Sequence, residues 1–576
     1  MPVPRVVTRY ELVTEEKAGG ATYTPQDLAD FVVTQMLQAT DLGKFKGPLR
    51  VLDPAVGDGE LLISILKQLP SRRSIEVHGF DTKKDALDRT ARRVSETFPG
   101  VSLDLRVADF LRFVLDMYGD DIAGGLFTRD VAATYDLIIA NPPYVRTQVM
   151  GAQHAKKLAD QFSLSGRVDL YYAFILAMAK VLNPHGTAGI IVSNRFMTTK
   201  AGSGVRRAIR DSFNLQHVWD LGDTKIFNAA VLPAVLLVQG RNDKPQRGIG
   251  FTSIYETQDA GTYKASTPVA ALQKRGVVEI SDGRRFCVRQ GHLDSAGGLS
   301  DVWRITTRES NRWLATVDAH TRRTFGDIGN IRVGVKTCAD KVFVRSDWEK
   351  LSEDERPELL RTLATHHIAR RFKADSGENQ RRILYPHQFI SGRREAVDLT
   401  EYPKAKSYLE RHREVLEGRK YVLEAGRNWY EIWVPQDPAA WDRTKLVFRD
   451  ISESPCFWID QAGCVVNGDC YWIICDRAQD EELLWMAAAV GNSTFIESFY
   501  DQRFNNKLYA GRRRFITQYV EKFPLPDPNT KIGSEIIGLS KAIYKAVGTT
   551  EAETVAATLD QMVWKAFGLG VKKIDR

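Results

Sequence analysis

The sequence predicts an α/β fold for the first half of the chain and a mixed α+β fold for the second half. In residues 49–240, short apolar runs alternate with amphipathic segments of helical period, which is typical of a largely parallel sheet covered by helices. Beyond residue 250, many short strand-like pieces are separated by arginine-rich loops. A chain of 576 residues is also too long for a single hydrophobic core, so we expect at least two domains.

Six apolar runs are the strand candidates of the first half. They span residues 49–53, 75–80, 103–109, 135–140, 187–193 and 234–239. Segments 83–98 and 168–182 carry apolar residues at helical spacing and predict helices between these strands. The polar stretch 240–250 predicts a domain boundary, and residues 534–569 again have a helical pattern. We predict a first domain at 1–245, a connecting region at 246–320, a second domain at 321–530 and a C-terminal helical segment at 531–576.

The composition is that of a globular protein, with 43% hydrophobic and 26% charged residues. The N-terminus lacks the apolar core of a signal peptide, and the longest apolar stretches are too short to span a bilayer. Six cysteines in so long a chain do not make a disulfide framework, so we expect a cytoplasmic location. Cys456, Cys464, Cys470 and Cys475 lie close together without a C-x-x-C pair, which favours packed or free thiols over a zinc site.

Positive charge and tryptophan are concentrated in the second half of the chain. The net charge is +8, and six of these excess charges lie beyond residue 240. Ten of the 11 tryptophans also follow residue 240. A mild basic excess of this kind permits a polyanionic partner.

A glycine-containing turn follows the strand predicted at 49–53. Gly57 and Gly59 let the backbone approach a ligand, and the helix that follows offers unpaired N–H groups. Asp81 ends the next strand, 22 residues after Gly59, where a carboxylate accepts from ribose hydroxyls. Position 62 is leucine instead of the third glycine of the dinucleotide fingerprint. This difference disfavours NAD and favours a smaller adenosine ligand.

Acidic residues end three successive predicted strands. Asp109 follows the third strand beside Phe110, an acceptor next to an apolar face that suits the amino group and ring of adenine. Together with Asp53 and Asp81, it falls at the edge formed by the carboxyl ends of the strands. Ligands of open parallel sheets bind at this edge, so we expect the nucleotide there.

The stretch YDLIIANPPY, residues 135–144, ends an apolar strand on a cluster of acceptors beside an aromatic ring. The side-chain oxygen of Asn141 and the carbonyl of Pro142 can both accept from one exocyclic amino group, and the two prolines add no competing donor. Two such acceptors pull the amino nitrogen out of conjugation, so that its lone pair can attack an electrophilic methyl group. Tyr144 supplies a face for a flat base. The pattern predicts methyl transfer by positioning, with no metal ion.

These motifs resemble the S-adenosylmethionine-dependent amino-group methyltransferases. The resemblance rests on DPAVGDG at 53–59 and NPPY at 141–144, and it extends to ATYTPQDLADFVV at 21–33 and to WDLGDTKIFNAAVLPAVLLV at 219–238. It implies a Rossmann-like catalytic domain with S-adenosyl-L-methionine as cofactor. The residues implied to bind the cofactor are Tyr23, Thr24, Pro25, Asp53, Pro54, Ala55, Gly57, Gly59, Asp81, Asp109 and Phe110. Those implied to be catalytic are Asn141, Pro142, Pro143, Tyr144 and Phe227, the last stacking on the target base.

The order of the motifs is similar to that of gamma-type DNA adenine-N6 methyltransferases of the TaqI kind, which belong to restriction-modification systems. By this resemblance, an Asn that opens the motif implies adenine as the target. Segments 331–344, 429–437, 445–450 and 510–528 resemble the specificity domain of this family. Residues 321–530 are therefore expected to form a mixed α+β DNA-recognition domain.

Base flipping explains why a second domain is expected. An adenine inside a duplex must leave the stack to reach a concave pocket, so another surface has to hold the DNA through phosphates and base edges. The candidate DNA-binding residues are Arg332, Lys336, Lys341, Arg371, Trp429, Arg512, Arg513 and Arg514. His366 and His367 are interpreted as flanking DNA or solvent, not as metal ligands.

Three other kinds of protein share some of these motifs. The NPPY chemistry also serves methyltransferases of ribosomal RNA and of release-factor glutamine, but release-factor enzymes lack a basic region of 336 residues after the catalytic domain. A fused restriction enzyme would carry a nuclease ahead of the first motif, where only about twenty residues lie. A non-catalytic specificity subunit would not need an intact glycine turn and NPPY. We expect a monomer that acts on double-stranded DNA, with a cognate restriction endonuclease encoded separately and no membrane association.

Overall fold

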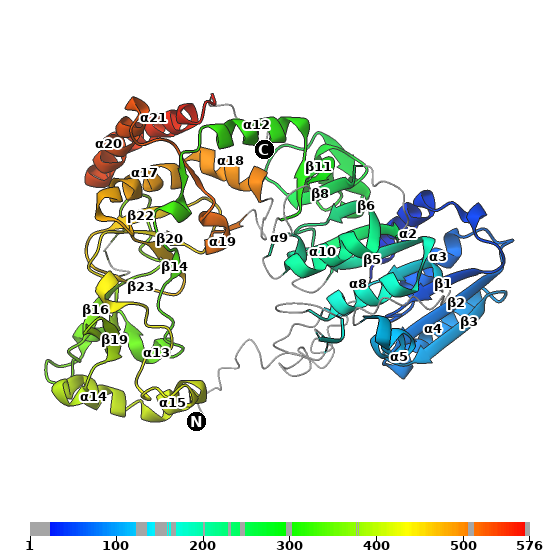
Figure 1. Cartoon of the computed structure of the whole chain (residues 1–576), viewed down its shortest axis with the longest axis horizontal. Helices are drawn as coiled ribbons and strands as arrows, with labels where there is room; N and C mark the ends of the chain where they lie inside the picture. The colour runs from blue at the N-terminus through cyan, green and yellow to red at the C-terminus, as the bar shows by residue number, and fades with distance from the viewer. Residues whose placement is uncertain are drawn as a thin grey trace. The chain divides into compact units, whose positions relative to one another are not determined.

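The computed structural model of the protein describes residues 24–122, 135–144, 158, 160–162, 169–199, 202–227, 232–241, 248–294, 302–375, 377, 380–504 and 512–570. The chain divides into two compact units, one that ends at Thr307 and one that begins at Arg308 (Figure 1). Each unit buries its own apolar clusters, as expected for a chain of this length.

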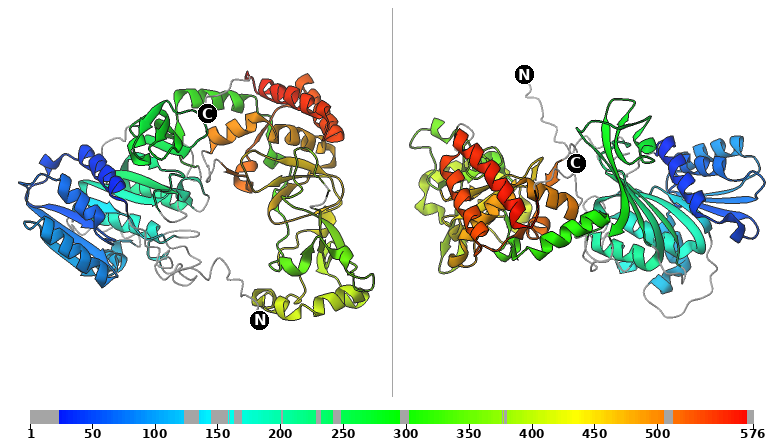
Figure 2. Two further views of the ribbon diagram at one scale, coloured as in Figure 1. Left: turned by 180° about the vertical axis from the view of Figure 1, so that it is seen from behind. Right: turned by 90° about the horizontal axis from the view of Figure 1, so that it is seen from above.

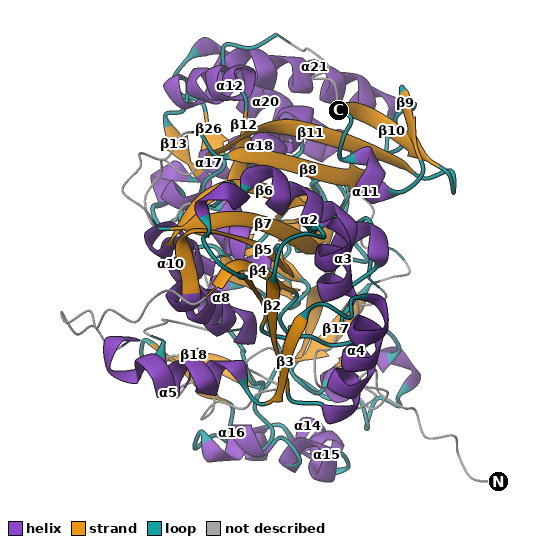
Figure 3. Cartoon of the chain, turned by 90° about the vertical axis from the view of Figure 1, so that its right-hand side faces the viewer, coloured by secondary structure: helices purple, strands orange, loops and turns teal. Residues whose placement is uncertain are grey.

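The described residues of the N-terminal unit form a 12-stranded sheet of order β3-β2-β1-β4-β5-β7-β6-β8-β11-β10-β9, with β12 paired to β11 (Figure 3). Its strands are β1 (Leu49–Asp53), β2 (Ile75–Asp81), β3 (Ser102–Val107), β4 (Tyr135–Ala140), β5 (Leu182–Ser193), β6 (Phe213–Asp220), β7 (Pro233–Gly240), β8 (Gly250–Glu256), β9 (Tyr263–Ala265), β10 (Gly276–Ile280), β11 (Arg285–Asp294) and β12 (Arg304–Thr306). Strands β1 to β5 are parallel to one another, and β7 runs antiparallel to both β5 and β6. The carboxyl ends of β1 to β6 therefore share one edge of the sheet.

Helices cover both faces of this sheet (Figure 3). One apolar cluster contains residues of α2 (Gln26–Ala39), α3 (Glu60–Gln68) and α4 (Lys84–Thr97). The other contains residues of α5 (Phe110–Ile122), α8 (Leu170–Val181), α9 (Arg195–Thr198) and α10 (Ser203–Ser212). Leu137 and Ile139 of β4 join the first cluster, and Ile138 and Ala140 join the second. Burial on both faces explains why residues 137–140 of β4 form an unbroken apolar run.

The C-terminal unit contains two four-stranded sheets. One has the order β14 (Arg332–Val333), β24 (Cys470–Ile473), β20 (Lys445–Arg449) and β22 (Phe457–Asp460), and the other has the order β15 (Val344–Arg345), β17 (Arg381–Leu384), β16 (Leu360–Ala364) and β23 (Val465–Val466). A helical core against the first sheet contains α12 (Arg308–Ala319), α17 (Glu482–Gly491), α18 (Thr494–Arg503), α20 (Lys531–Ala546) and α21 (Thr550–Ala566). In Figure 2, α20 and α21 are the paired red helices.

Shorter elements complete the C-terminal unit. They include α13 (Asp340–Phe343), α14 (Pro403–Glu410), α15 (Arg413–Glu417), α16 (Lys420–Glu424) and α19 (Thr517–Val520), and the strand pairs β13 (Arg323–Thr324) with β26 (Pro524–Leu525), β18 (His387–Ile390) with β19 (Arg393–Ala396), and β21 (Ile451–Ser452) with β25 (Arg513–Arg514). No helix in the described ranges combines the length and apolarity needed to cross a membrane.

The predicted fold class is confirmed, with local differences in its elements. β1 and β4 have the predicted bounds, but the sequence analysis misses β6 because Gln216 and His217 interrupt its apolar run. Residues 250–306 add β8 to β12 to the sheet, whereas the sequence predicts a connecting region at 246–320. The helical pattern at 534–569 corresponds to α20 and α21, which are separated at Gly548, where φ is +91°.

Candidate active site

The glycine turn lies between β1 and α3 and has the backbone geometry that its sequence predicts. Gly57 and Gly59 have φ angles of +56° and +80°, a region that favours glycine. The Gly57 N–H donates to Oδ2 of Asp81 at 2.9 Å, which ties the turn to the end of β2. Apart from its own chain neighbours, no heavy atom of the described residues lies within 4 Å of the place that a Cβ on Gly57 would occupy. This side of the turn is therefore open to an approaching ligand.

Asp53, at the end of β1, is a fully buried carboxylate with an unsatisfied oxygen. Its Oδ1 accepts from the Ala55 N–H at 3.0 Å, whereas its Oδ2 has no hydrogen-bond partner within the described structure. Burial raises the pKa of Asp53 to about 8, and the nearby Asp81 and Asp58 add to this increase. A buried acceptor of this kind is a natural partner for a cationic or hydrogen-donating group of a ligand.

Of the other predicted cofactor residues, Asp81 and Asp109 accept hydrogen bonds from backbone N–H groups, and Phe110 lies in the core. Asp81 also accepts from the Lys83 N–H at 2.8 Å, and Asp109 accepts from the Leu111 N–H at 2.8 Å at the start of α5. Phe110 is a core residue whose ring stacks on Phe174 at a centroid distance of 5.9 Å. Phe110 can therefore back a nucleotide site but does not present an exposed face to it.

Asn141 and Tyr144 leave β4 at the edge where β1 ends, because Val51 and Leu52 pair with Leu137 and Ile138. The Asn141 side-chain Nδ2 donates to Oγ1 of Thr24 at 3.0 Å. The Asn141 Oδ1 accepts from the Tyr144 hydroxyl at 2.8 Å. The candidate catalytic acceptor thus has an internal donor, and the NPPY segment lies beside the glycine turn.

The Tyr144 ring packs edge-on against Tyr171 at 6.1 Å, beside the apolar cluster of the α5 and α8 face. Burial raises the pKa of Tyr144 well above its usual value. Its hydroxyl is therefore protonated at neutral pH and can act as the donor to Asn141. Pro142 is buried and Pro143 is half-buried, which fixes the segment between Asn141 and Tyr144.

The motifs at 21–33 and 219–238 differ in whether their residues contact this site. Thr24 is buried and binds Asn141, and the Pro25 carbonyl accepts from the Ala29 N–H at the start of α2. Tyr23 lies outside the described residues. Phe227 is only 5% exposed and belongs to the apolar cluster of the α2 and α3 face. The structure therefore places its ring in the core and not on an open surface.

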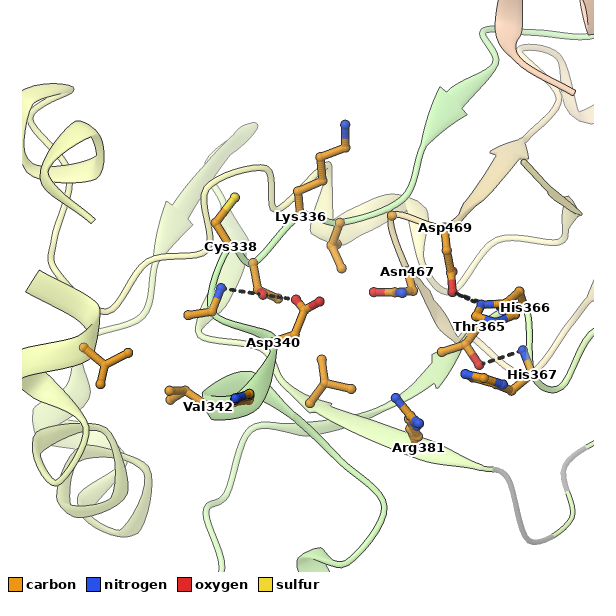
Figure 4. A pocket seen from close by; sticks show the side chains of 17 residues that line it. Lys336, Cys338, Asp340, Val342, Thr365, His366, His367, Arg381, Asn467 and Asp469 are labelled. Carbon is orange, nitrogen blue, oxygen red and sulfur yellow. Dashed lines mark hydrogen bonds and ion pairs between the residues drawn. The ribbon is translucent and has the colours of Figure 1, made fainter. Parts of the chain in front are cut away.

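Two of the predicted DNA-binding residues, Lys336 and Lys341, line a pocket of about 810 Å³ in the C-terminal unit (Figure 4). Arg332 lies 5.4 Å above the ring of Trp472, and Arg413 covers the ring of Trp429 at 4.8 Å. Trp429 is half-buried, so little of its ring is left for a base. Arg512 is exposed.

Three predicted DNA-binding arginines have internal partners that the sequence analysis does not foresee. Arg513 binds both carboxylate oxygens of Asp501 at 2.8 Å, and its side chain is only 11% exposed. Arg514 lies 3.2 Å from Asp450, and Arg371 lies 3.8 Å from Glu497. Asp501 lies 12 residues before Arg513, and Asp450 lies 64 residues before Arg514, so arginines in an acid-free run of residues can still contact acids in the folded chain. The fully open part of the predicted tract 512–514 is Arg512.

The same pocket contains polar residues that the sequence analysis does not assign to a base-reading site. Thr365, His366 and His367 follow β16, and Asn467 and Asp469 follow β23. The available signal was a short apolar strand followed at once by polar residues, as in VVNGD. That signal is as common in ordinary turns as in binding sites.

Among the described residues there is neither a disulfide nor a cluster of metal-ligand side chains. All six cysteines are free thiols, and Cys464, Cys470 and Cys475 are buried. Burial raises the pKa of Cys464 and Cys475 to about 12. Within the described ranges, no three His, Cys, Asp or Glu side chains gather as a metal site would require.

Known proteins match both units. Residues 69–227 match the Eco57I restriction-modification methylase family, and residues 381–525 match the TaqI-like C-terminal specificity domain. The chain is 36% identical to the type II methyltransferase M.BanIII of Aneurinibacillus aneurinilyticus, over 98% of this chain and 99% of that protein. It is 24% identical to the type II methyltransferase M.PaeR7I of Pseudomonas aeruginosa, over 94% and 93% of the two chains.

Solved structures share the fold at low sequence identity. The cryo-EM structure of a DrdV–DNA complex has a TM-score of 0.53 and 10% identity, over 94% of this chain and 60% of that chain. A nuclease-deletion mutant of the type ISP restriction-modification enzyme LlaGI, in complex with a DNA substrate mimic, has a TM-score of 0.52 and 12% identity, over 91% and 47%. With the full-length relative and the two family matches, the chain belongs to the DNA methyltransferases of type II restriction-modification systems.

Proposed function

We propose that the protein transfers the methyl group of S-adenosyl-L-methionine to the N6 amino group of an adenine flipped out of duplex DNA. The observation that carries this proposal is the position of Asn141 and Pro142. They follow β4 at the sheet edge where β1 ends, next to a glycine turn that is open to a ligand. An amide oxygen and a carbonyl at that place suit an exocyclic amino group.

The chain's own residues perform the reaction by orientation. The Asn141 Oδ1 and the Pro142 carbonyl accept the two N6 hydrogens, which localises the nitrogen lone pair for attack. Thr24 binds Asn141 Nδ2 at 3.0 Å and so fixes which end of the amide faces the base. The Tyr144 hydroxyl donates to Asn141 Oδ1 at 2.8 Å, and in this proposal the adenine replaces it there. Once displaced, Tyr144 is available to stack on the base.

The residues at the glycine turn fit the proposed cofactor, which supplies an electrophilic methyl group when bound. The unpartnered Oδ2 of Asp53 suits the cationic ammonium group of the methionine portion. Asp81 and Asp109 follow neighbouring strands and offer acceptors for the ribose hydroxyls and the adenine amino group. The open side of Gly57 leaves room for this ligand. A role for Phe227 as a stacking residue requires its buried ring to turn toward the base.

The target class follows from the second unit. A full-length type II methyltransferase relative and a matched specificity domain favour duplex DNA over the alternatives, ribosomal RNA and release-factor glutamine. We further propose that the protein acts as a monomer that protects DNA from a separately encoded endonuclease. Incubation with methyl-labelled S-adenosylmethionine should label duplex DNA and neither ribosomes nor release factor. Label in either of those substrates and none in DNA would overturn the proposal.

A further inference from the structure

The pocket in the C-terminal unit is built on two short parallel strands. β16 and β23 pair in parallel, with Leu363 opposite Val465 and Ala364 opposite Val466. Their carboxyl ends therefore meet at one edge, and the residues that follow both strands emerge side by side. The opposite wall is formed by the turn after β14 and by α13, with Cys338 and Asp340 facing Asn467 and His366 across the hollow (Figure 4).

The backbone around Asn467 is fixed from two sides. Its N–H donates to the Ala364 carbonyl at 2.8 Å, and the Val335 N–H donates to the Val466 carbonyl at 2.7 Å. A Cβ on Gly334 would lie 2.1 Å from the Asn467 carbonyl oxygen, so glycine allows this close approach. The backbone of Asn467, from which its side chain projects, is therefore held in a defined place.

The side chain of Asn467 makes no hydrogen bond within the described part of the chain. The residue is half-buried and lines the pocket. Its carboxamide offers one acceptor and two donors to the pocket. Beside it, the Nδ1 of His366 contacts Asp469, which fixes the imidazole on the same wall. An amide that lines the pocket without an internal partner can pair with the edge of a planar ligand that carries a donor next to an acceptor.

The charges at this pocket favour a polyanion that carries such edges. Lys336, Lys341 and Arg381 line it, and none of the three has an ion-pair partner among the described residues. Of the acidic residues, Asp340 contacts Thr337 and the Oδ2 of Asp469 contacts His366, while the buried Oδ1 of Asp469 has no partner in the described part of the chain. Free cations around a free amide match phosphates around a base edge.

We propose that this pocket reads base edges of the DNA target and that Asn467 is a specificity-determining residue that recognises an adenine other than the methylated one. Asparagine matches adenine because its amide can accept from N6 and donate to N7 in the major groove. This inference rests on the proposed function. The pocket joins Asn467, which lies within the matched specificity domain, to residues 335–344 and 365–367, which lie ahead of it in sequence.

The test compares Asn467→Ala with the matched variant Asn529→Ala, whose side chain is exposed outside the pocket. Each full-length protein is expressed in cells without other methyltransferases, and the methylated motif is determined by long-read sequencing. Asn467→Ala should accept other bases at one A·T position of the motif, with preference for the correct base reduced about 10- to 100-fold. Asn529→Ala should methylate the wild-type motif.

Asn467→Asp provides a second variant of nearly the same shape. A carboxylate accepts but cannot donate, so it should shift the preference at that same position toward cytosine, whose N4 is a donor. An unchanged motif in both Asn467 variants would overturn the inference, provided that wild-type protein methylates adenine. Absence of methylated adenine with the wild-type protein would instead contradict the proposed function, so the two failures are distinguishable.

Discussion

The sheet edge that carries Asn141 and the pocket that carries Asn467 are built on the same principle in the two units. Each places polar side chains directly after neighbouring parallel strands, β1 and β4 in one case and β16 and β23 in the other. They differ in how their residues are distributed along the sequence. The NPPY segment contains its acceptors and its ring in four consecutive residues, whereas the pocket combines segments from Val335 to Asp469.

The two asparagines also differ in their partners. Asn141 exchanges hydrogen bonds with Thr24 and Tyr144, whereas the Asn467 side chain has none within the described structure. A catalytic amide has to be held in one orientation before the base arrives, so internal bonds preorganise it. A base-reading amide contributes to specificity most when its bonds form only with the correct base.

The largest effect is expected at Asn141, the proposed catalytic residue. Asn141→Ala removes one of two acceptors for the amino group, so methyl transfer should fall about 100- to 1,000-fold. Affinity for S-adenosylmethionine, measured by calorimetry, should change little because the glycine turn is intact. Normal turnover by this variant would remove Asn141 from the chemistry. Unlike the Asn467 variants, Asn141→Ala should keep the wild-type motif in its residual activity.

Arg513 and Arg512 should separate folding from DNA binding. Arg513→Ala removes the two hydrogen bonds that Arg513 donates to the nearly buried Asp501, and the free energy of unfolding should fall by about 3 kcal/mol. Arg512→Ala should leave stability unchanged and should reduce the slope of log Kd against log salt by about 1 if it contacts a phosphate. Denaturant titrations and salt-dependent binding measure these quantities. If the Arg513→Ala protein is stable and its salt slope is reduced, Arg513 contacts DNA.

Asp53→Asn should have opposite effects on stability and on cofactor binding. Its pKa is raised from 3.8 to about 8 in the folded protein, so the unfolded chain releases this proton at lower pH. The ligand-free protein therefore loses stability as pH rises between these values. Asp53→Asn removes that loss, and its thermal midpoint should equal the wild-type value near pH 4 and exceed it at pH 8.

Cofactor affinity provides the complementary measurement for Asp53. Asp53→Asn should weaken S-adenosylmethionine binding about 10- to 100-fold at pH 8, because a charge-assisted hydrogen bond is lost. Wild-type affinity should rise with pH up to about 8 as the carboxylate forms. A pH-independent affinity that the substitution does not change would place the ammonium group elsewhere.

The smallest effect is expected at the Tyr144 hydroxyl. Tyr144→Phe keeps the ring for stacking but removes the donor that occupies Asn141 Oδ1. The KM for DNA should fall about 2- to 10-fold with little change in kcat, because the base no longer competes with an internal hydrogen bond. Steady-state kinetics test this expectation. A higher KM would mean that the hydroxyl helps to bind the base.

The parts of the site that could be predicted from sequence are those in which chemistry and local backbone coincide. Gly57 and Gly59 have the expected positive φ, and Asn141 follows β4 at the expected edge. Arg513 and Phe227 show the limit of this approach. Their burial depends on Asp501 and on the packing of a whole sheet face, and neither is visible in the local sequence. The pocket around Asn467 needs three distant segments to meet, so only the fold reveals it.

Nucleoside analysis of the methylated product tests the central claim most directly. Duplex DNA is incubated with the protein and methyl-labelled S-adenosylmethionine, digested to nucleosides and separated by mass spectrometry. If Asn141 and Pro142 hold an adenine amino group at the sheet edge, all of the label should be found in N6-methyladenine. Label in a methylated cytosine would contradict the proposed orientation of the base in this site.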